Sequence, residues 1–576
     1  MVLKINGKKT CAAYLWLIVL LLLAIKSAAV LFSLCGSELF ALKYGFFIIP
    51  PLLLLISFSF LFSERAGNIY LLALDLFLSL LFIADIIYAR AFGHLLNIYM
   101  IFTFDNMNDL SESAFAMMRW TDYLMLTDVP ALFFIIRKSP GQCAGKKRTV
   151  LFLLAALFGC AFLFFRINGL NKSRELENIE KQPVLISPAG YHIYDIAQLI
   201  YEQTDSFDEE EIAEVKSWHE SNKALLRPDP AFADLEGLIK GKNIIAVQFE
   251  SLENFLIGRS VCGQQITPNI NGLLKNSIYF SGIIAQVRDG NSSDAELMFN
   301  SSMYPVSRGS TFFRFGKNAY ASLPKLLKKQ GYATMAVHGD ERTYWNRDEA
   351  FLALGFDEYI DEGMFSDKSA IGMGISDRAL FSQSFSEIKK LKEPYYLFII
   401  TLTSHMPFRL DEEEKYLDLP FEGAYADYLQ SIHYTDKMFG EFYDRLIEEG
   451  CDDTVFIIYG DHEGIHKYYK ANSDLPENDS RIPFIIYIPG IEGFASDKIG
   501  GQVDMMPTLA FLLGLDCKEY DSYVMGRNLL GKFSGSAISP TGETAEEADY
   551  KELLSEAQRI ADMSIRGNYA KRFDGR

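Results

Sequence analysis

The sequence has few cysteines and no cysteine pattern that would build a disulfide framework or a zinc site. Seven cysteines occur in 576 residues, and no two of them are spaced as CxxC. Four lie in or beside long apolar runs, which leaves Cys262, Cys451 and Cys517 for the rest of the chain. We interpret all seven as packed thiols.

The chain also lacks the clustered basic residues that nucleic-acid binding requires. Lysine and arginine total 55 against 74 aspartate and glutamate residues, which gives a formal net charge of −19. Affinity for a phosphate backbone needs grouped Lys and Arg side chains, so the composition argues against a nucleic-acid partner. The acidic runs at 208–211 and 411–414 are typical of solvated surface.

Long apolar runs, in contrast, fill the first third of the sequence and predict a transmembrane domain over residues 1–166. A membrane-spanning helix needs roughly 20 apolar residues. The five predicted spans cover residues 12–32, 45–62, 68–89, 119–136 and 150–166. A cleaved signal peptide is less favoured for the first run, because the run is long, contains Lys26 and is followed by four others. Asp75 and Asp85 are costly in lipid, so we expect them at a helix interface or in the headgroup region.

Lysine and arginine residues orient these spans. They precede the first span, occur at Arg65 between the second and third, and fill the segment 137–148 between the fourth and fifth. The positive-inside rule places these three segments in the cytoplasm. With five spans, everything after Arg166 is extracellular, so we expect a multi-pass protein of the cell membrane.

Beyond the spans the sequence changes character. Residues 167–235 are polar and helix-prone, which indicates a helical linker. Over residues 236–532, short apolar strands alternate with amphipathic stretches, a pattern typical of an α/β domain with a mostly parallel central sheet covered on both faces. A stretch rich in Gly, Ser, Pro and Thr then opens a C-terminal appendage, 533–576. The predicted fold class is a five-helix transmembrane domain joined to an extracellular α/β domain.

Two predicted strands end in side chains that bind metal ions. The segment 243–250, NIIAVQFE, ends in Glu250, and the segment 455–464, VFIIYGDHEG, ends in Asp461 and His462. If the two strands are neighbours in the sheet, their carboxyl ends can bring these groups to one divalent cation. The sequence therefore predicts a metal-dependent enzyme.

Between those strands, residues 289–296 read DGNSSDAE. Ser293 and Glu296 match a capping box, which predicts a helix start with Ser292 at its first position or just before it. The free N–H groups and positive dipole of a helix N-terminus favour phosphate and a developing alkoxide. Taken alone, the octamer is more often a plain helix cap than a nucleophile.

Three further clusters complete an ordered set. They are HGDERTYWNR at 338–347, TLTSHMPF at 401–408 and GGQVDMMPT at 500–508. Together with DGNSSDAE, GDHEG and the predicted spans, they resemble the lipoteichoic acid synthases, which are glycerol-phosphate transferases of the alkaline phosphatase and sulfatase superfamily. The resemblance covers nearly the whole chain and implies a sulfatase-like fold for the extracellular domain.

The resemblance implies a role for each motif residue. Glu250, Ser292, Asp461 and His462 would bind one divalent cation, with manganese favoured over magnesium. Ser292 would be the nucleophile. His405 would contact the transferred group, protonate the leaving diacylglycerol oxygen and later deprotonate the acceptor hydroxyl.

Asp340, Trp345 and Arg347 would cradle the glycerol phosphate, with Arg347 making a bidentate contact to phosphate. His466 is a weaker candidate ligand, because the family uses a single metal with the ligands already named. The implied reaction moves sn-glycerol 1-phosphate from phosphatidylglycerol to a glycolipid-anchored polyglycerol-phosphate chain. It is a ping-pong reaction through a covalent glycerophosphoryl-serine, on the outer face of the membrane.

The chain departs from the family pattern at two site positions. Ser292 replaces a threonine, which keeps the hydroxyl but loosens its rotamer. Glu463 takes a position that often holds an aromatic residue. The C-terminal part also looks shorter.

Several alternatives stay open. A primase that adds only the first glycerol phosphate carries the same motifs, and a phosphodiesterase would pass the phosphoryl group to water. A phosphoethanolamine transferase would want further zinc-binding histidines. An inactive sensor would be expected to have lost a ligand. A sulfatase is disfavoured, because no Cys/Ser-x-Pro-x-Arg sequence surrounds Ser292.

Overall fold

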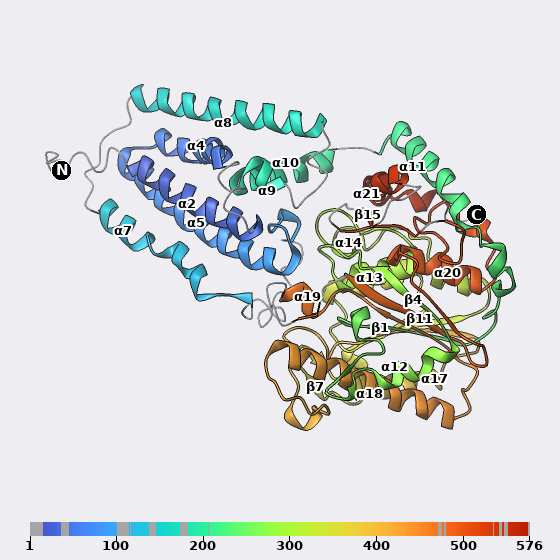
Figure 1. Cartoon of the computed structure of the whole chain (residues 1–576). Helices are drawn as coiled ribbons and strands as arrows, with labels where there is room; N and C mark the ends of the chain where they lie inside the picture. The colour runs from blue at the N-terminus through green and yellow to red at the C-terminus, as the bar shows by residue number, and fades with distance from the viewer. Residues whose placement is uncertain are drawn as a thin grey trace. The chain divides into compact units, whose positions relative to one another are not determined.

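The computed structural model divides the chain into two compact units (Figure 1). The first is drawn from residues 1–98 and 114–205, and the second from residues 99–113 and 206–576. The structure describes residues 15–35, 45–100, 115, 117–137, 146–172, 182–204, 207–469, 475–476, 480–533, 535–540, 544–545 and 551–573.

Three helices of the first unit are long and apolar enough to cross a membrane. They lie within α2 (Leu15–Cys35), α5 (Glu64–Phe92) and α8 (Lys146–Lys172). The second predicted span is a shorter apolar helix, Gly45–Leu61, which comprises η1 (Gly45–Ile48), α4 (Ile49–Ser57) and η2 (Phe58–Leu61).

The prediction of five spans fails most clearly at the fourth. Residues 119–136 form two short pieces, η4 (Trp120–Leu126) and α7 (Val129–Arg137). Pro130 lies in the first turn of α7, where it lacks an N–H and disfavours a continuous helix through the preceding residue. In the described part of the chain, three helices rather than five therefore reach the length of a membrane span.

The charged residues of the long helices meet partners inside the first unit, as expected for a helix interface. The ammonium of Lys26 on α2 donates to Asp75 Oδ1 at 2.9 Å and to Ser79 Oγ at 2.8 Å, both on α5. Asp85 lies 2.9 Å from a ring nitrogen of His192. Pairing of this kind offsets the cost of placing charges among apolar helices.

The predicted linker 167–235 is instead divided between the two units. After α8, the helices α9 (Gln182–Ile186) and α10 (Pro188–Thr204) share a hydrophobic core with the first unit through residues such as Ile186 and Tyr191. The following helix, α11 (Glu209–Asn222), belongs to the second unit. Averaged over residues 167–235 the composition is polar, but apolar side chains of these helices are buried.

The second unit contains a nine-stranded sheet in the order β12-β4-β11-β10-β1-β9-β5-β6, with β13 added beside β4. The strands are β1 (Ile244–Phe249), β4 (Ser277–Ile284), β5 (Ala333–His338), β6 (Glu358–Ile360), β9 (Tyr395–Ile400), β10 (Val455–Gly460), β11 (Arg481–Tyr487), β12 (Phe494–Ser496) and β13 (Gly500–Gly501). The run from β10 to β6 is parallel, and β11 is antiparallel to both of its neighbours. The predicted α/β domain with a mostly parallel sheet is confirmed.

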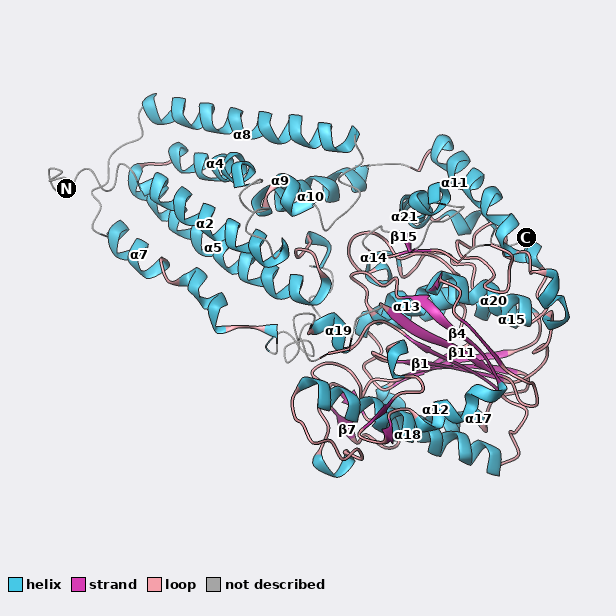
Figure 2. Cartoon of the chain, viewed as in Figure 1, coloured by secondary structure: helices cyan, strands magenta, loops and turns pink. Residues whose placement is uncertain are grey.

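Helices cover both faces of this sheet, as Figure 2 shows. One layer includes α13 (Ser292–Ser301), α15 (Leu323–Lys329) and α20 (Met505–Leu512), and the other includes α12 (Pro268–Leu273), α17 (Asp377–Ile388) and α18 (Ala424–Glu448). Because both faces are covered, β1, β9 and β10 are buried at all six positions. That burial explains their continuous apolar sequences.

The C-terminal appendage packs on the second unit. Its helix α21 (Lys551–Arg566) lies along α11, where Trp218 Nε1 donates to the carbonyl of Leu553 at 2.9 Å. Several apolar side chains of α21 join the core of the second unit, including Ile560 and Met563.

His219 on α11 makes this packing sensitive to acid. The side chain is buried, its ring stacks on Tyr569, and Nδ1 lies 3.2 Å from the carbonyl of Val524. Burial lowers the pKa of His219 to about 4. The unfolded chain takes up this proton below about pH 6.5, so the stabilisation is complete above that pH and is lost as the pH falls towards 4.

We therefore expect the second unit to lose ~2 kcal/mol of stability through His219 between pH 7.5 and pH 5. His219→Phe should remove that part of the pH dependence, since it keeps the ring stack and Val524 still accepts from Asn222 Nδ2 at 3.3 Å. Thermal unfolding of the full chain in detergent at the two pH values measures the effect. An unchanged pH dependence in the variant would contradict it.

Candidate active site

Four side chains converge where β1 and β10 end. The register pairs Phe249 with Gly460, which places Glu250 beside Asp461 at the carboxyl edge of the sheet. Glu250, Asp461 and His462 are buried, and each offers one ligand atom within 4.8 Å of the others. The prediction that the two strands are neighbours is confirmed.

Local hydrogen bonds orient each of these groups. Asp461 Oδ1 accepts the backbone N–H groups of Ser251 and His462, both at 2.8 Å, and its Oδ2 is buried without a hydrogen-bond partner. His462 Nδ1 lies 2.8 Å from the carbonyl of Glu463, so Nδ1 donates and Nε2 presents its lone pair. Nε2 is 3.4 Å from Glu250 and from Asp461 Oδ2.

The electrostatics of this cluster fit a bound cation. Burial raises the pKa of Glu250, and burial together with the neighbouring Glu250 raises the pKa of Asp461 well above its usual range. Burial lowers the pKa of His462, which keeps its ring neutral. Two adjacent buried carboxylates are unfavourable without a counter-charge, and two oxygens with one imidazole nitrogen suit a divalent metal ion. These residues therefore fit such an ion.

Ser292 lies against the same cluster. Its hydroxyl donates to Glu250 Oε2 at 3.1 Å and lies 3.5 Å from His462 Nε2. It is the first residue of α13, and the preceding Asn291 has φ 46° and ψ −120°, an unusual backbone conformation for a side-chain-bearing residue. The N–H groups at the start of α13 thus lie beside a hydroxyl and a candidate metal site.

The predicted capping box is wrong, although the helix begins at the expected position. Ser293 Oγ donates to the carbonyl of Gly290 at 2.6 Å, and Glu296 pairs with an arginine. Asp294 instead stabilises the loop before α13, since its Oδ2 accepts the N–H groups of Arg288 and Gly290. The pattern S-x-x-E identified the helix start but not its contacts.

Arg347 makes a protein contact that the sequence did not predict. Its Nε and Nη2 donate to the carboxylate of Glu296 at 2.7–3.2 Å, and Nη1 is buried without a hydrogen-bond partner. Burial alone would lower the pKa of Arg347, but Glu296, and more weakly Asp340, raise it. Glu296 occupies the Nε–Nη2 edge of the guanidinium, so the N–H groups of Nη1 are the ones best placed for a ligand.

The other residues of HGDERTYWNR lie between β5 and α16 (Arg347–Leu354). Asp340 is buried, and its Oδ1 accepts the N–H of Glu341 at 2.8 Å. Trp345 has φ 57°, and its ring lies 6.0 Å from that of Phe313. The buried, aromatic setting of Trp345 is compatible with both a core role and a wall for a ligand.

The segment after β9 supports Glu250 and carries His405. Thr401 Oγ1 accepts the N–H of Glu250 at 2.9 Å, and Ser404 Oγ donates to its carbonyl at 2.7 Å. Burial lowers the pKa of His405, with the charge of Asp461 opposing the shift. Burial therefore favours the neutral ring of His405, and the negative charge of Asp461 favours its protonated form.

Comparison with known proteins identifies the family. Residues 2–206 match the lipoteichoic acid synthase N-terminal domain, and residues 242–515 match the sulfatase domain. The chain is 31% identical over 494 residues to lipoteichoic acid synthase 1 of Bacillus subtilis, which covers 81% of this chain and 76% of that protein. The chain belongs to the lipoteichoic acid synthase family.

Two further similar proteins support this family assignment, and a third shares the fold. The Staphylococcus aureus synthase is 30% identical over 501 residues, which is 82% of this chain and 76% of the relative. A solved lipoteichoic acid synthase from Listeria monocytogenes is 27% identical, with a TM-score of 0.51, and covers 62% of this chain and 98% of that one. An alkaline phosphatase superfamily protein from Vibrio parahaemolyticus shares the fold, with a TM-score of 0.50 at 21% identity.

In this member of the lipoteichoic acid synthase family, His466 is not a further metal ligand. Its Nδ1 bonds to the carboxylate of Glu253, and its Nε2 lies 2.8 Å from the carbonyl of Pro476. Burial raises the pKa of Glu253. Burial alone would lower the pKa of His466, but its hydrogen bond to Glu253 and the charge of Glu253 raise it, and the charge of Glu463 adds a smaller upward contribution to both groups. Sequence reasoning missed Glu253, although it lies three residues beyond Glu250.

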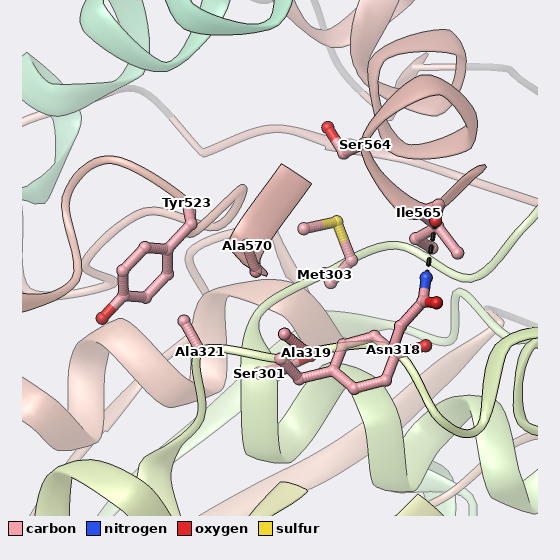
Figure 3. A pocket seen from close by; sticks show the side chains of 10 residues that line it. Ser301, Met303, Asn318, Ala319, Ala321, Tyr523, Ser564, Ile565 and Ala570 are labelled. Atoms are coloured by element: carbon pink, nitrogen blue, oxygen red, sulfur yellow. Dashed lines mark hydrogen bonds between the residues drawn. The ribbon is translucent and has the colours of Figure 1, made fainter. Parts of the chain in front are cut away.

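A small cavity lies at the opposite end of α13 from Ser292 (Figure 3). Ser301 and Met303 line it beside Ser564 and Ile565 of α21, and Asn318 Nδ2 donates to the carbonyl of Ile565 at 2.6 Å. At 1.5 Å per residue, α13 separates this cavity from Ser292 by roughly 14 Å. The cavity is therefore distinct from the candidate active site.

Proposed function

We propose that this protein is a membrane-anchored glycerophosphotransferase of lipoteichoic acid synthesis, with its second unit on the extracellular side. It transfers sn-glycerol 1-phosphate from phosphatidylglycerol to a glycolipid-anchored polyglycerol-phosphate chain. The observation that carries the proposal is the hydroxyl of Ser292, which lies 3.1 Å from Glu250 and 3.5 Å from His462 at the start of a helix. Membership of the lipoteichoic acid synthase family supports the same assignment.

Glu250, Asp461 and His462, with Ser292, would hold one divalent cation, manganese or magnesium. When bound, such a cation lowers the pKa of a neighbouring hydroxyl and offsets charge on a phosphate. The protein's own contribution is to fix the ligands, as the hydrogen bonds to Asp461 Oδ1 and His462 Nδ1 do. Because these side chains are already held in position, they do not have to rearrange during the reaction.

Transfer then takes two steps. In the first, Ser292 Oγ passes its proton to Glu250 and attacks the phosphorus of phosphatidylglycerol. The bond to the diacylglycerol oxygen breaks, and His405, which enters the step in its protonated form, gives its proton to that oxygen and becomes neutral. In the second, neutral His405 takes the proton from the acceptor hydroxyl, whose oxygen attacks the same phosphorus, and the released Ser292 oxygen takes its proton back from Glu250. The covalent glycerophosphoryl-serine makes the reaction ping-pong.

Three further residues would hold the glycerol phosphate. Asp340 can accept hydrogen bonds from glycerol hydroxyls, and Trp345 supplies an apolar wall. Arg347 contributes Nη1, because its other edge is engaged by Glu296. We therefore assign the substrate contact of Arg347 to its Nη1 side, away from Glu296.

The test is intact-mass spectrometry of the full chain in detergent after incubation with manganese and phosphatidylglycerol. A glycerophosphate adduct and released diacylglycerol are expected. An adduct formed only from phosphatidylethanolamine would indicate a phosphoethanolamine transferase, and transfer to water alone would indicate a phosphodiesterase. Product chains of a single unit would indicate a primase. No adduct with metal bound would remove the proposal in favour of an inactive sensor.

A further inference from the structure

Gln248 is a polar side chain inside the core of the sheet. It lies on β1, whose sequence IIAVQF is otherwise apolar and whose six positions are all buried. The side chain of Gln248 is itself fully buried. Burying an amide costs free energy unless its oxygen and its nitrogen both find hydrogen-bond partners. The partners of this amide therefore show what it does in the fold.

Both ends of the Gln248 amide are engaged. Its Oε1 accepts the hydroxyl of Tyr459, which is its register partner on β10. Its Nε2 donates to the backbone carbonyl of Ser292 at 3.3 Å. The ring of Tyr459 in turn stacks on Phe299 of α13, with the ring centroids 4.3 Å apart. Gln248 and Tyr459 thus connect the two ligand-bearing strands to the helix that begins with Ser292.

Ser292 is held by β1 and its extension at two atoms. Gln248 contacts the carbonyl of Ser292, and Glu250, two residues further along, accepts the Ser292 hydroxyl at 3.1 Å. Side chains two positions apart in an extended chain point the same way, which explains why both reach one residue. Contacts at the backbone and at the hydroxyl together determine where Oγ lies relative to an incoming phosphorus.

The backbone before Ser292 depends on such support. Asn291 has φ 46° and ψ −120°, a conformation that residues with a side chain seldom adopt. Backbone of this kind is costly and persists only where the surrounding contacts enforce it. A donor fixed to the centre of the sheet, bonded to the next residue along the chain, is such a contact.

We infer that Gln248 is a positioning residue, which holds the backbone of Ser292 so that Oγ is directed at the phosphorus. The inference rests on the proposed function and adds a residue that this reaction requires. Because Gln248 is buried and bonds to the backbone of Ser292, it acts through Ser292 and not on the substrate. Its loss should therefore lower the rate of attack and leave substrate affinity unchanged.

The first test compares rate with affinity. Gln248→Met keeps the length of the side chain and removes the amide. In the full chain in detergent with manganese, this variant should form the glycerophosphate adduct from phosphatidylglycerol roughly 10- to 100-fold more slowly, because a displacement of about 1 Å can cost that much. The phosphatidylglycerol concentration that gives half the maximal rate should stay within about threefold. An unchanged rate, or a change confined to that concentration, would overturn the inference.

A second variant separates positioning from stability. Gln248→Met also leaves the buried Tyr459 hydroxyl without its acceptor, which should lower the melting temperature. Adding Tyr459→Phe removes that hydroxyl and keeps the ring that stacks on Phe299. Replacing both partners by apolar groups is close to neutral, so the double variant should recover most of the melting temperature but not the rate. Recovery of both would reduce Gln248 to a purely structural role.

Tyr396→Phe is a matched control at the other end of α13. The buried Tyr396 hydroxyl donates to Asn300 Oδ1 at 2.9 Å, and Asn300 lies eight residues beyond Ser292, which is roughly 12 Å along the helix. This variant removes one buried hydrogen bond from the same helix without touching its first residue. It should lower the melting temperature and keep the adduct rate within about threefold. Slowing equal to that of Gln248→Met would contradict a role specific to Ser292.

A fluorophosphonate reagent makes the result independent of the donor. It forms a phosphorus–oxygen bond with the Ser292 hydroxyl and releases hydrogen fluoride, so its labelling rate measures the same attack. Slower labelling of Gln248→Met in a protein that forms no adduct from phosphatidylglycerol supports the inference and contradicts the proposed function. Adduct formation and labelling at wild-type rates in Gln248→Met do the reverse. A wild-type protein that neither reagent modifies at Ser292 would contradict both.

Discussion

Ser292→Ala should lower glycerophosphate transfer by about three orders of magnitude or more, because removing a covalent nucleophile leaves only binding and electrostatic effects. The glycerophosphate adduct should disappear with the activity. Diacylglycerol release from phosphatidylglycerol, measured with the full chain in detergent, provides the rate. The hydroxyl donates to the carboxylate of Glu250 at 3.1 Å, and alanine keeps the backbone at the start of α13, so the fold should tolerate the substitution.

Two matched variants sharpen this result. Ser292→Thr restores the residue usual in the family and should retain activity, since the hydroxyl is preserved. Ser293→Ala removes the adjacent hydroxyl, which donates to the carbonyl of Gly290 and not to the ligand cluster, and should keep most of the activity. Full activity in Ser292→Ala, or an equal loss in Ser293→Ala, would disprove the assignment of the nucleophile.

Asp461→Asn should abolish both activity and the response to metal. Asp461 Oδ2 is buried with no hydrogen-bond partner, and the amide would replace a charged ligand with a neutral one. We expect a rate loss of about three orders of magnitude or more, and no rise in melting temperature on adding manganese. In the wild-type protein, manganese should stabilise the second unit by relieving the repulsion between Glu250 and Asp461, and a chelator should reverse the effect.

Thermal unfolding with and without manganese measures this stabilisation, and bound metal can be counted by elemental analysis. Asp504→Asn is an informative control, because Asp504 is also buried but pairs with Arg527 at 3.0 Å. That variant should lose stability while keeping the manganese response. A manganese response in Asp461→Asn equal to that of the wild type would contradict the ligand assignment.

The sequence alone determined the fold class of the second unit and the residues that meet at its candidate metal site. Short, largely apolar runs such as 244–249 and 455–460 are typical of strands that are buried on both faces of a sheet. Parallel strands present their following residues at one edge, so Glu250, Asp461 and His462 were predictable as a group once the two strands were taken as neighbours. Both predictions depend on residue patterns within single strands, and the pairing of the strands in the sheet is consistent with those patterns.

Tertiary structure alone decided which partner each charged side chain takes. The sequence around Arg347 is the same whether its guanidinium binds phosphate or a protein carboxylate. Only the packing of α13 against α16 brings the Glu296 carboxylate to it. The contact of Lys467 with Asn291 is likewise set by the fold. Side-chain pairing across elements depends on distances that no local pattern encodes.

Helix boundaries and packing faces were decided in the same way. Hydrophobicity predicted five spans, but the interruption before α7 and the shorter Gly45–Leu61 helix emerge only in the structure. The polar segment 167–235 was predicted as a linker because composition averages over helix faces, whereas Ile186 and Tyr191 pack on one side. Sequence periodicity indicates which elements form, and packing between elements determines where helices end and which faces and charges are paired.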